Sequence, residues 1–331
     1  MKYIRNSSTD PHYNMSFDEY CLERFPSNDA VFFLWRNSPS VIIGRNQNAY
    51  AEVNLPYLEA NGIKLARRVT GGGAVYHDLQ NLNYTIVGRS ADLDRDFPGY
   101  LHMMLDALRA LGVPAEMTGR NDIVVEGRKV SGYAKRVYKD RLMVHGTLMY
   151  DVDIASLTEA LSVPGSKMDA AGIVSVRSRV ANLKDYLTQF SCIEEMQEAL
   201  ERILSRDYND AQVILTGEQE EEIREICRTK FSTWEWNYGL SPKAGFSRAS
   251  RLPCGTVEVR CSIVRGKVRG LSFGGDFIGS LPAEGLAAAL EGCRFDRSTL
   301  LEALRALGVS RYFDGVTPEQ LAGLFIPFDL R

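Results

Sequence analysis

Three consecutive glycines directly after a pair of arginines constrain this chain more than any other feature of its sequence. The run reads Arg67-Arg68-Val69-Thr70-Gly71-Gly72-Gly73-Ala74-Val75-Tyr76-His77-Asp78 and leads back into strand-like sequence. Glycines can adopt positive φ and leave bare N–H groups facing a ligand, and their entropic cost makes such a run hard to explain as filler. The arginines supply fixed positive charge suited to phosphate or carboxylate. The run predicts a ligand-binding loop; a simple tight turn or bulge is the alternative.

A second unusual run extends from Gly119 to Ala134 and predicts a strand, a turn and a return strand. Residues 123–125 are Ile-Val-Val, Glu126-Gly127 is a turn signal, and Lys129-Val130 opens the return strand, which Gly132 is expected to break. Lys129 therefore lies beside a hairpin and not on a solvated helix face. Basic residues gather around it in a chain whose net charge is -3, so this local field does not follow from bulk composition. The alternative is an exposed edge hairpin whose lysines prevent pairing with other chains. It explains the positions of Lys135 and Lys139 well and that of Lys129 poorly.

Composition excludes several classes of protein. The chain has 331 residues, 45% of them hydrophobic, which is enough for a large core and predicts two domains. With 39 basic and 42 acidic residues it carries no overall nucleic-acid footprint. Neither an apolar leader at the N-terminus nor an apolar run of membrane-spanning length is present in the sequence, so we expect a soluble, cytoplasmic protein with no membrane partner. Its six cysteines form no C-x-x-C pair and are expected to be reduced.

The order of elements predicts a mixed α/β fold. Strands are expected at 31–35, 41–43, 63–69 and 82–87, and helices at 54–60, about 98–111, 153–161, 191–205 and 218–230. We expect a large mixed-sheet catalytic domain over 1–240 and a polar linker over 241–249. A small α+β accessory domain is expected over 250–331. In that domain the sequence predicts a hairpin around Gly266-Lys267, a helix capped by Asp296 and a capping box at Thr317-Pro318-Glu319-Gln320.

Eight short motifs, in order along the chain, resemble the lipoate-protein ligases of the bacterial long type. They are the segments 35–37 and 43–48, the run from Arg67 to Asp78, Asn81-Leu82-Asn83-Tyr84, GRNDIVVEGRKVSG, HGTLMYD, GIVSVRSRVANL, and 234–239. Each is weak alone, but together they span about two hundred residues, leaving little room for coincidence. The resemblance implies the biotin/lipoate ligase fold and an enzyme that activates lipoate with ATP and Mg²⁺. The lipoyl-adenylate then gives its lipoyl group to a lysine of an acceptor domain.

The resemblance also implies site residues. Lys129 matches the lysine of the family's RKVSG motif and is the expected catalytic cation, placed to stabilise charge that develops on the acyl phosphate. Binding of ATP and the adenylate is expected from Arg68, Gly71, Gly72, Gly73, Ala74, Val75, Tyr76, Asn81, Asn121, Asp122, Lys129 and His145. Asp122 is also the candidate ligand for Mg²⁺ or the partner of Lys129. Acceptors would be lipoyl domains of 2-oxoacid dehydrogenase complexes or the glycine-cleavage carrier protein.

One departure from the family pattern bears on the substrate. Tyr133 stands where relatives more often have Asn or Ser after RKVSG, and this segment is expected near the acyl tunnel. The phenol could shorten the tunnel, which puts the preference between lipoate and octanoate in doubt, or point into the core.

Three alternative functions fit the sequence less well. A lipoyl or octanoyl transferase would use a cysteine nucleophile, and none lies between Cys21 and Cys192. A biotin ligase would carry a GRGRxGR-type loop, which is missing. A non-catalytic lipoate-binding protein of the same fold remains an alternative, against which the complete RKVSG motif argues. No Walker GxxxxGK[ST] or GxGxxG motif is present either, so any nucleotide must be bound by a different loop.

Overall fold

The computed structural model describes residues 1–27, 29–89, 93–118, 122–161, 179–205, 212–241 and 244–326. The chain divides into two compact units. The first contains residues 1–45 and 63–232, and the second contains residues 46–62 and 233–331. Among the described helices, none is long and apolar enough to cross a membrane.

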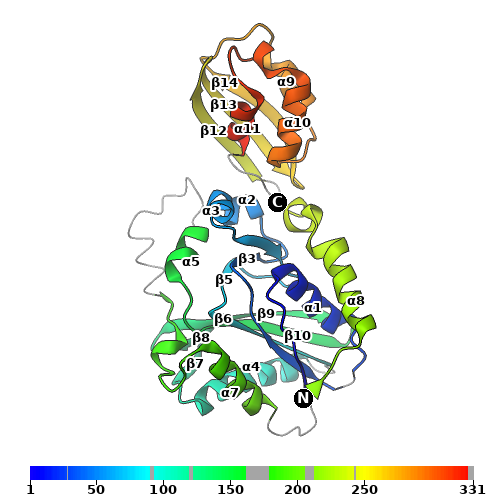
Figure 1. Ribbon diagram of the computed structural model, residues 1–331, viewed down its shortest axis with the longest axis vertical. Helices are drawn as coiled ribbons and strands as arrows, with labels where there is room; N and C mark the ends of the chain where they lie inside the picture. The colour runs from blue at the N-terminus through cyan, green and yellow to red at the C-terminus, as the bar shows by residue number, and fades with distance from the viewer. Residues whose placement is uncertain are drawn as a thin grey trace. The chain divides into compact units, whose positions relative to one another are not determined.

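A large mixed sheet forms the frame of the first unit (Figure 1). Its strands lie in the order β11-β1-β2-β6-β10-β9-β8-β7. Strand β1 pairs in parallel with β2 and β11, and the remaining pairs are antiparallel. The bounds are β1 (Lys2–Ile4), β2 (Val31–Trp35), β6 (Asn81–Arg89), β7 (Ala115–Thr118), β8 (Asp122–Val125), β9 (Arg128–Tyr138), β10 (Arg141–Met149) and β11 (Gln212–Val213).

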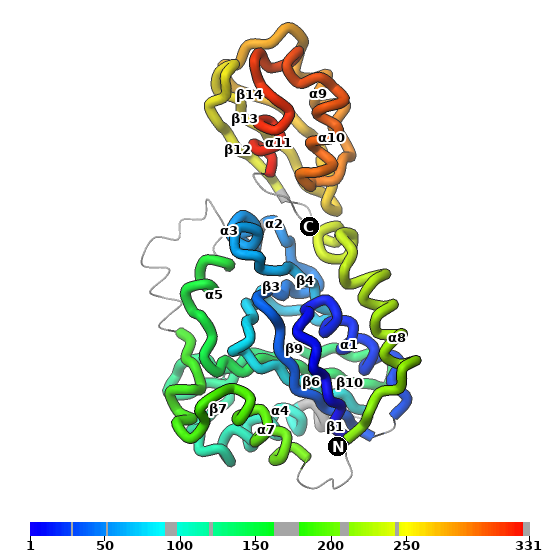
Figure 2. Tube along the Cα trace, viewed as in Figure 1, coloured from blue at the N-terminus to red at the C-terminus, as the bar shows by residue number. Residues whose placement is uncertain are grey.

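The two faces of this sheet differ in chemistry because side chains alternate along each strand. On β6, Leu82, Tyr84 and Ile86 enter the main hydrophobic core. Helices α4 (Leu93–Ala110) and α7 (Ile193–Leu204) supply the other side of that core, and Figure 2 shows them together beneath the sheet. Asn83 and Thr85 point to the opposite face, which α1 (Pro11–Glu23) covers by packing on β6 and β10. The sheet thus has one apolar face and one face lined by buried polar groups.

A three-stranded sheet in the order β4-β3-β5 completes the cover of the polar face. Strand β3 (Ser40–Ile43) pairs in parallel with β4 (Lys64–Arg67) and antiparallel with β5 (Val75–His77). The glycine run is the connection between β4 and β5. The other elements of the unit are α5 (Ile154–Ala160), a 3₁₀ turn (Leu183–Asp185) and α8 (Gly217–Ile226), which continues as a π-helical turn (Cys227–Phe231).

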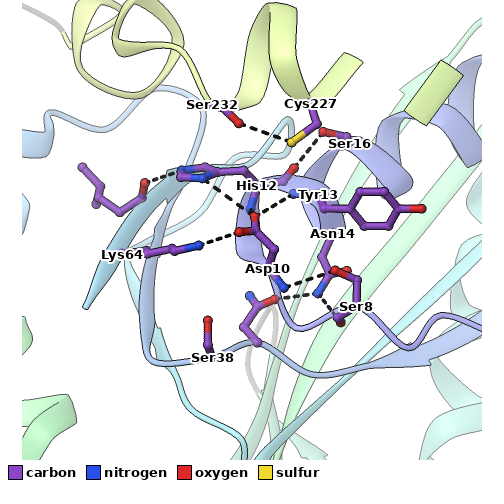
Figure 3. Close-up of polar contacts among 12 residues, drawn as sticks. Ser8, Asp10, His12, Tyr13, Asn14, Ser16, Ser38, Lys64, Cys227 and Ser232 are labelled. Carbon is purple, nitrogen blue, oxygen red and sulfur yellow. Dashed lines mark hydrogen bonds and ion pairs between the residues drawn. The ribbon is translucent and has the colours of Figure 1, made fainter. Parts of the chain in front are cut away.

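Helix α1 begins at a well-defined cap. Asp10 accepts hydrogen bonds from the backbone N–H groups of His12 and Tyr13, and Pro11 occupies the first helical turn, where no donor is needed. The Asp10 carboxylate also pairs with Lys64 of β4, so the cap ties α1 to the smaller sheet (Figure 3).

The second unit has its own core and its own sheet. Strands β12 (Ala244–Leu252), β13 (Gly255–Val264) and β14 (Lys267–Gly275) form an antiparallel sheet. Its helices are α2 (Ala49–Glu52), α3 (Leu55–Ala60), α9 (Ala283–Ala289), α10 (Arg297–Leu307) and α11 (Pro318–Phe325), with a π-helical turn (Glu235–Gly239) and a 3₁₀ turn (Val309–Arg311). The caps predicted at Asp296 and Thr317 are confirmed.

Three local predictions need correction. Most of the segment 241–249, predicted as a linker, belongs to strand β12, because its backbone pairs with β13 from Ala244 to Leu252. The hairpin after β13 turns at Arg265-Gly266, where both residues have positive φ, one position earlier than predicted. Gly132 does not break its strand, since β9 continues to Tyr138. The turn at Glu126-Gly127, with φ of 51° and 74°, is confirmed.

Candidate active site

A cavity of about 370 Å³ lies between the polar face of the large sheet and the elements that cover it. Met15 of α1, Ile42 of β3 and Val75 of β5 line its cover, while the sheet supplies its floor. A cavity of this size is in the range of small-molecule sites. The described residues that line it all belong to the first unit.

The floor of the cavity is a row of residues that crosses four neighbouring strands. Trp35 of β2 pairs with Asn83 of β6, Asn83 pairs with Thr147 of β10, and the hydroxyl of Thr147 accepts from the backbone N–H of Gly132 on β9 at 3.2 Å. Since strands lie about 4.8 Å apart, three spacings give a floor of about 14 Å. One end of the cavity is therefore at Trp35 and the other at Gly132.

The Gly132 end carries a charged pair. The Lys129 ammonium lies 2.7 Å from the Asp122 carboxylate, and both side chains are close to 40% exposed. A Cβ on Gly132 would come within 2.8 Å of the Lys129 Nζ, so the glycine leaves the space that the lysine head occupies. The backbone carbonyl of Lys129 accepts from the N–H of Ala181, which fixes the strand beneath it. Lys129 is thus anchored by its backbone, and its charge is partly exposed and paired with Asp122.

Arg68 holds the glycine run in place. Its Nη2 donates to the carbonyls of Gly71 and Gly73 at 2.8 Å, and its Nη1 donates to the carbonyl of Ile42 at 3.0 Å. Burial lowers the pKa of Arg68 to about 10, so the guanidinium stays charged near neutral pH. Gly72 adopts a φ of 98°, the left-handed region that favours glycine. The sequence suggested Arg68 as a cation for the ligand; most of its donors are instead engaged by the loop that lines the cavity.

Close approach of two backbone segments explains a second glycine. A Cβ on Gly44 would lie 2.1 Å from the carbonyl oxygen of Gly72, so the segment after β3 can meet the glycine run only without a side chain. The fully buried Arg67 secures that segment by donating to the carbonyls of Gly44 and Arg45. Arg68 therefore holds the glycine run and Arg67 holds the segment after β3, and these two backbone segments meet at Gly72 and Gly44.

A buried carboxylate, which the sequence analysis missed, orders the polar groups of the floor. The side chain of Asp18 on α1 is 1% exposed and lies 2.7 Å from Nδ1 of His145. Nε2 of His145 lies 2.7 Å from the hydroxyl of Thr70, which also accepts from Nε of Arg68 at 3.0 Å. Because the Asp18 carboxylate can only accept, Nδ1 of His145 carries a proton, and the Thr70 hydroxyl, which accepts from the arginine, donates to Nε2. The chain of donors runs from Arg68 through Thr70 and His145 to Asp18.

A second chain of donors reaches the same carboxylate from the far end of the cavity. Trp35 Nε1 donates to the hydroxyl of Thr85 at 3.0 Å, and that hydroxyl donates to Asp18 Oδ1 at 2.7 Å. A buried negative charge requires such pairing, because an unpaired one is strongly destabilising. Asp18 therefore connects the Trp35 wall to the loop that carries the glycines.

Most of the predicted site residues lie together. The cavity is lined by Arg68, Gly72, Gly73, Ala74, Val75, Asp122, Lys129, Tyr133 and His145. Gly71, Tyr76 and Asn81 are not among the described residues that line it: Gly71 contributes its carbonyl to Arg68, Tyr76 is buried, and Asn81 donates to Asn83. Asn121 and the segment 172–178 of the GIVSVRSRVANL motif lie outside the described residues.

Other residues of the cavity were not predicted as site residues. Trp35, His77 and Asn83 lie within motifs named in the sequence analysis, but no site role was predicted for them. The position of His77 shortly after the glycine run could have indicated one. Asp18 and Thr85 gave no signal, since Thr85 is a single polar residue in an apolar segment and Asp18 stands beside Glu19 among other polar residues.

Within the described part of the chain, Asp122 is not grouped with two or more other carboxylate, histidine or cysteine side chains as metal ligands. Among the described residues, no group of three or more His, Cys, Asp or Glu side chains is arranged to hold a metal ion. Its carboxylate pairs with Lys129, one of the two partners suggested by the sequence. Mg²⁺ commonly binds through one or two carboxylates together with substrate phosphates, so a single carboxylate beside a nucleotide is compatible with such an ion.

Comparison with known sequences places the chain in a family. The family described as lipoyl protein ligase A/B catalytic domain matches residues 10–205, and that described as bacterial lipoate protein ligase C-terminus matches residues 241–325. Lipoate-protein ligase LplJ of Bacillus subtilis is 37% identical over 329 residues, covering 98% of this chain and 99% of the relative. A lipoate–protein ligase of Staphylococcus aureus is 38% identical over 326 residues, with coverage of 98% and 99%.

Solved structures agree with this placement. A bipartite lipoate protein ligase of Thermoplasma acidophilum, described with its E2 lipoyl domain, gives a TM-score of 0.66 at 33% identity, covering 72% of this chain and 96% of that one. A lipoate-protein ligase A bound with ATP gives 0.63 at 32% identity, with coverage of 72% and 98%. A further Thermoplasma acidophilum structure, a putative ligase with bound lipoic acid, gives 0.60 at 30% identity with the same coverage.

Proposed function

Because this chain belongs to the lipoate-protein ligase family, we propose that its cavity binds lipoate with the carboxyl group at Lys129 and the ring at Trp35. The observation that carries the proposal is the floor of about 14 Å between these two residues, which suits an extended eight-carbon acid with a terminal ring. Lys129 supplies a cation at one end for a carboxylate, and aromatic and apolar walls at the other end suit the dithiolane ring.

In the first step a carboxylate oxygen of lipoate attacks the α-phosphorus of ATP. A new P–O bond forms, the bond to the pyrophosphate oxygen breaks, and pyrophosphate leaves with its electron pair. Lys129 stands at the reacting end as a positive charge that stabilises the developing negative charge. The glycine run, held open by Arg68, leaves backbone and space for the phosphate against the cavity wall.

In the second step the amine of an acceptor lysine attacks the acyl carbon of lipoyl-adenylate. The C–N bond forms, the C–O bond to AMP breaks, and the amine loses a proton to solvent. Lys129 again lies where charge develops, first on the carbonyl oxygen and then on the departing phosphate. The ligase acts on lipoyl domains, and among these we propose those of 2-oxoacid dehydrogenases or the glycine-cleavage carrier as acceptors.

ATP is the proposed nucleotide, on the strength of the ATP-bound relative. Mg²⁺ would accompany its phosphates and supply a Lewis acid to them, with Asp122 as the candidate carboxylate. The side chain of Asp122 also limits where Lys129 can point, because the two charges are 2.7 Å apart.

We propose that residues 1–240 hold the groups for transfer and that 250–331 serve adenylate formation as an accessory domain. In support, the residues that line the cavity within the described part of the chain all precede residue 148. A cytoplasmic location is proposed from the six cysteines, all of which are free thiols.

The decisive experiment has two stages on the full chain. Pyrophosphate release is first measured with ATP and, in parallel, lipoate, octanoate or biotin. An isolated lipoyl domain is then added and its mass followed for the increment of one lipoyl group. We expect release with lipoate and modification of one lysine. Release with biotin alone, or lipoate binding without release, would contradict the proposal and favour a biotin ligase or a non-catalytic binding protein.

A further inference from the structure

His77 is a buried polar side chain in the cavity wall that the reaction described above does not use. It is 3% exposed, its Nδ1 lies 3.1 Å from Asn37 Nδ2, and its Nε2 has no hydrogen-bond partner among the described residues. Leaving a buried donor or acceptor unpaired destabilises the folded state, so most buried polar groups in proteins have a hydrogen-bond partner. The chemistry of that nitrogen depends on which ring atom carries the proton.

A row of asparagines fixes the proton of His77. Asn14 Nδ2 donates to the carbonyls of Ser8 at 3.0 Å and Arg36 at 3.1 Å, which identifies it as the nitrogen; Figure 3 shows the contact with Ser8. The same nitrogen donates to Asn37 Oδ1 at 2.8 Å, so the nitrogen of Asn37 must face His77. An amide nitrogen only donates, and therefore Nδ1 of His77 accepts.

The ring of His77 is neutral, because burial, together with the nearby Arg68 and His145, lowers its pKa to about 3. A neutral ring with an accepting Nδ1 carries its proton on Nε2. His77 thus presents one N–H donor that no described residue accepts. His145, held by Asp18, carries its proton on the other ring atom and has partners on both nitrogens.

His77 belongs to the end of the cavity remote from Lys129. Its ring meets Trp35 edge to face, with centroids 6.1 Å apart, and Trp35 ends the floor about three strand spacings from Gly132. An acid whose carboxyl group lies at Lys129 brings no oxygen to this end. Lipoate, however, brings the two sulfurs of its dithiolane, whereas octanoate brings only methylene and methyl groups.

We propose that the Nε2–H of His77 donates to a dithiolane sulfur and makes this enzyme prefer lipoate over octanoate. This inference rests on the proposed orientation of lipoate in the cavity. Divalent sulfur is a weak, polarisable acceptor that suits an apolar wall. Octanoate would leave the N–H unpaired, which lowers its relative affinity. His77 is in these terms a specificity residue, and it takes no part in the bond changes at the carboxyl end.

Two substitutions at the same position separate the donor from a structural role. The amide nitrogen of glutamine reaches the place of Nε2, whereas that of asparagine reaches the place of Nδ1. We expect His77→Gln to keep the wild-type ratio of kcat/KM for lipoate over octanoate within about threefold, and His77→Asn to lower it about tenfold, since 1.4 kcal/mol is a factor of ten. The assay is pyrophosphate release with ATP and each acid.

The same experiment contains the results that would overturn the inference. If His77 only supports Asn37, His77→Asn should retain more activity than His77→Gln and the ratio should not change in either variant. A second measurement uses the wild-type protein: the ¹⁵N resonance of His77 Nε2 should shift on binding lipoate and not on binding octanoate. Equal shifts would mean a water or another acceptor serves the N–H. Failure of both acids to release pyrophosphate would instead refute the ligase function.

Discussion

The two ends of the cavity differ in burial and in how their polar groups are paired. At one end Lys129 and Asp122 are each close to 40% exposed and are bound to each other by a single ion pair. At the other end Trp35, Thr85 and Asp18 are almost fully buried, and each donor in their chain has a defined acceptor. The charge at the reacting end is therefore accessible to a substrate, whereas the wall at the other end is held by buried hydrogen bonds.

This difference predicts which substitutions change activity alone and which also change stability. An exposed ion pair contributes about 0–1 kcal/mol to folding, so the Lys129 end can be altered at little structural cost. A buried, fully paired network loses several kcal/mol when one partner is removed. Substitutions at the Lys129 end should therefore change activity alone, and those near the buried end should change stability as well.

The largest expected effect is that of Lys129→Ala. We expect lipoylation to fall by at least about 3 kcal/mol in transition-state stabilisation, while the free energy of unfolding changes by less than about 1 kcal/mol. The measurements are single-turnover transfer and urea denaturation. Gly132→Ala is the matched control, because it keeps both charges but displaces the lysine head, and an intermediate loss is expected. Near-normal turnover of Lys129→Ala would remove its catalytic role.

Arg68→Lys should affect both properties. Lysine keeps the charge but cannot satisfy Ile42, Thr70, Gly71 and Gly73 together, so we expect a loss of about 1–3 kcal/mol in stability and a raised KM for ATP. Thermal unfolding and ATP-dependent kinetics measure the two effects. A raised KM without loss of stability would place the arginine on the ligand and not on the loop.

The buried end should make stability depend on pH. The pKa of His77 is lowered from 6.5 to about 3, so the unfolded chain takes up a proton before the folded one does. This contribution is complete above pH 6.5 and is lost as the pH falls toward 3, by about 2 kcal/mol between pH 7 and pH 5. His77→Gln should therefore show a flatter pH profile in urea denaturation. Parallel profiles for the two proteins would mean that His77 is already protonated or accessible in the folded state.

The smallest effect is expected from Tyr133→Asn. The ring lines the cavity on β9, near the Lys129 end, and its burial raises the pKa of the phenol. Removing its bulk should change the ratio of kcat/KM for lipoate over octanoate by at most about 1–3 kcal/mol, the usual scale for reshaping an apolar pocket. An unchanged ratio would leave the ring a packing role in the core that it also joins.

The parts of the site built from residues close together in the sequence could be predicted, and the parts that join distant residues could not. The glycine run and the hairpin at Lys129 are local, and their backbone follows from neighbouring residues such as Glu126-Gly127. The pairing of Asp18 with His145 joins positions 127 residues apart, and it depends on the register of β10 against β6 and on the placing of α1. Arg68 was predicted as a ligand cation because sequence reveals charge but not the carbonyls that a buried guanidinium will meet.

The fold shows the same limit. Helices and strands with clear periodicity were predicted near their observed bounds, and the caps at Asp296 and Thr317 were confirmed. The start of strand β12 was predicted as a linker because the sequence 240–245 is polar and contains a proline and a glycine. Only its pairing with β13, which begins three residues after β12 ends, makes it a strand.

Because side chains alternate along each strand of the large sheet, the cavity floor and the hydrophobic core use different residues of the same strands. Asn83 and Thr147 on the cavity floor each have a core residue beside them, Leu82 and Leu148, pointing to the opposite face. Selection for another carboxylic acid can therefore act on every second residue of these strands while the residues between them keep the hydrophobic core. A scaffold of this kind can change its substrate range at the cavity floor while the apolar residues on the opposite face keep their packing.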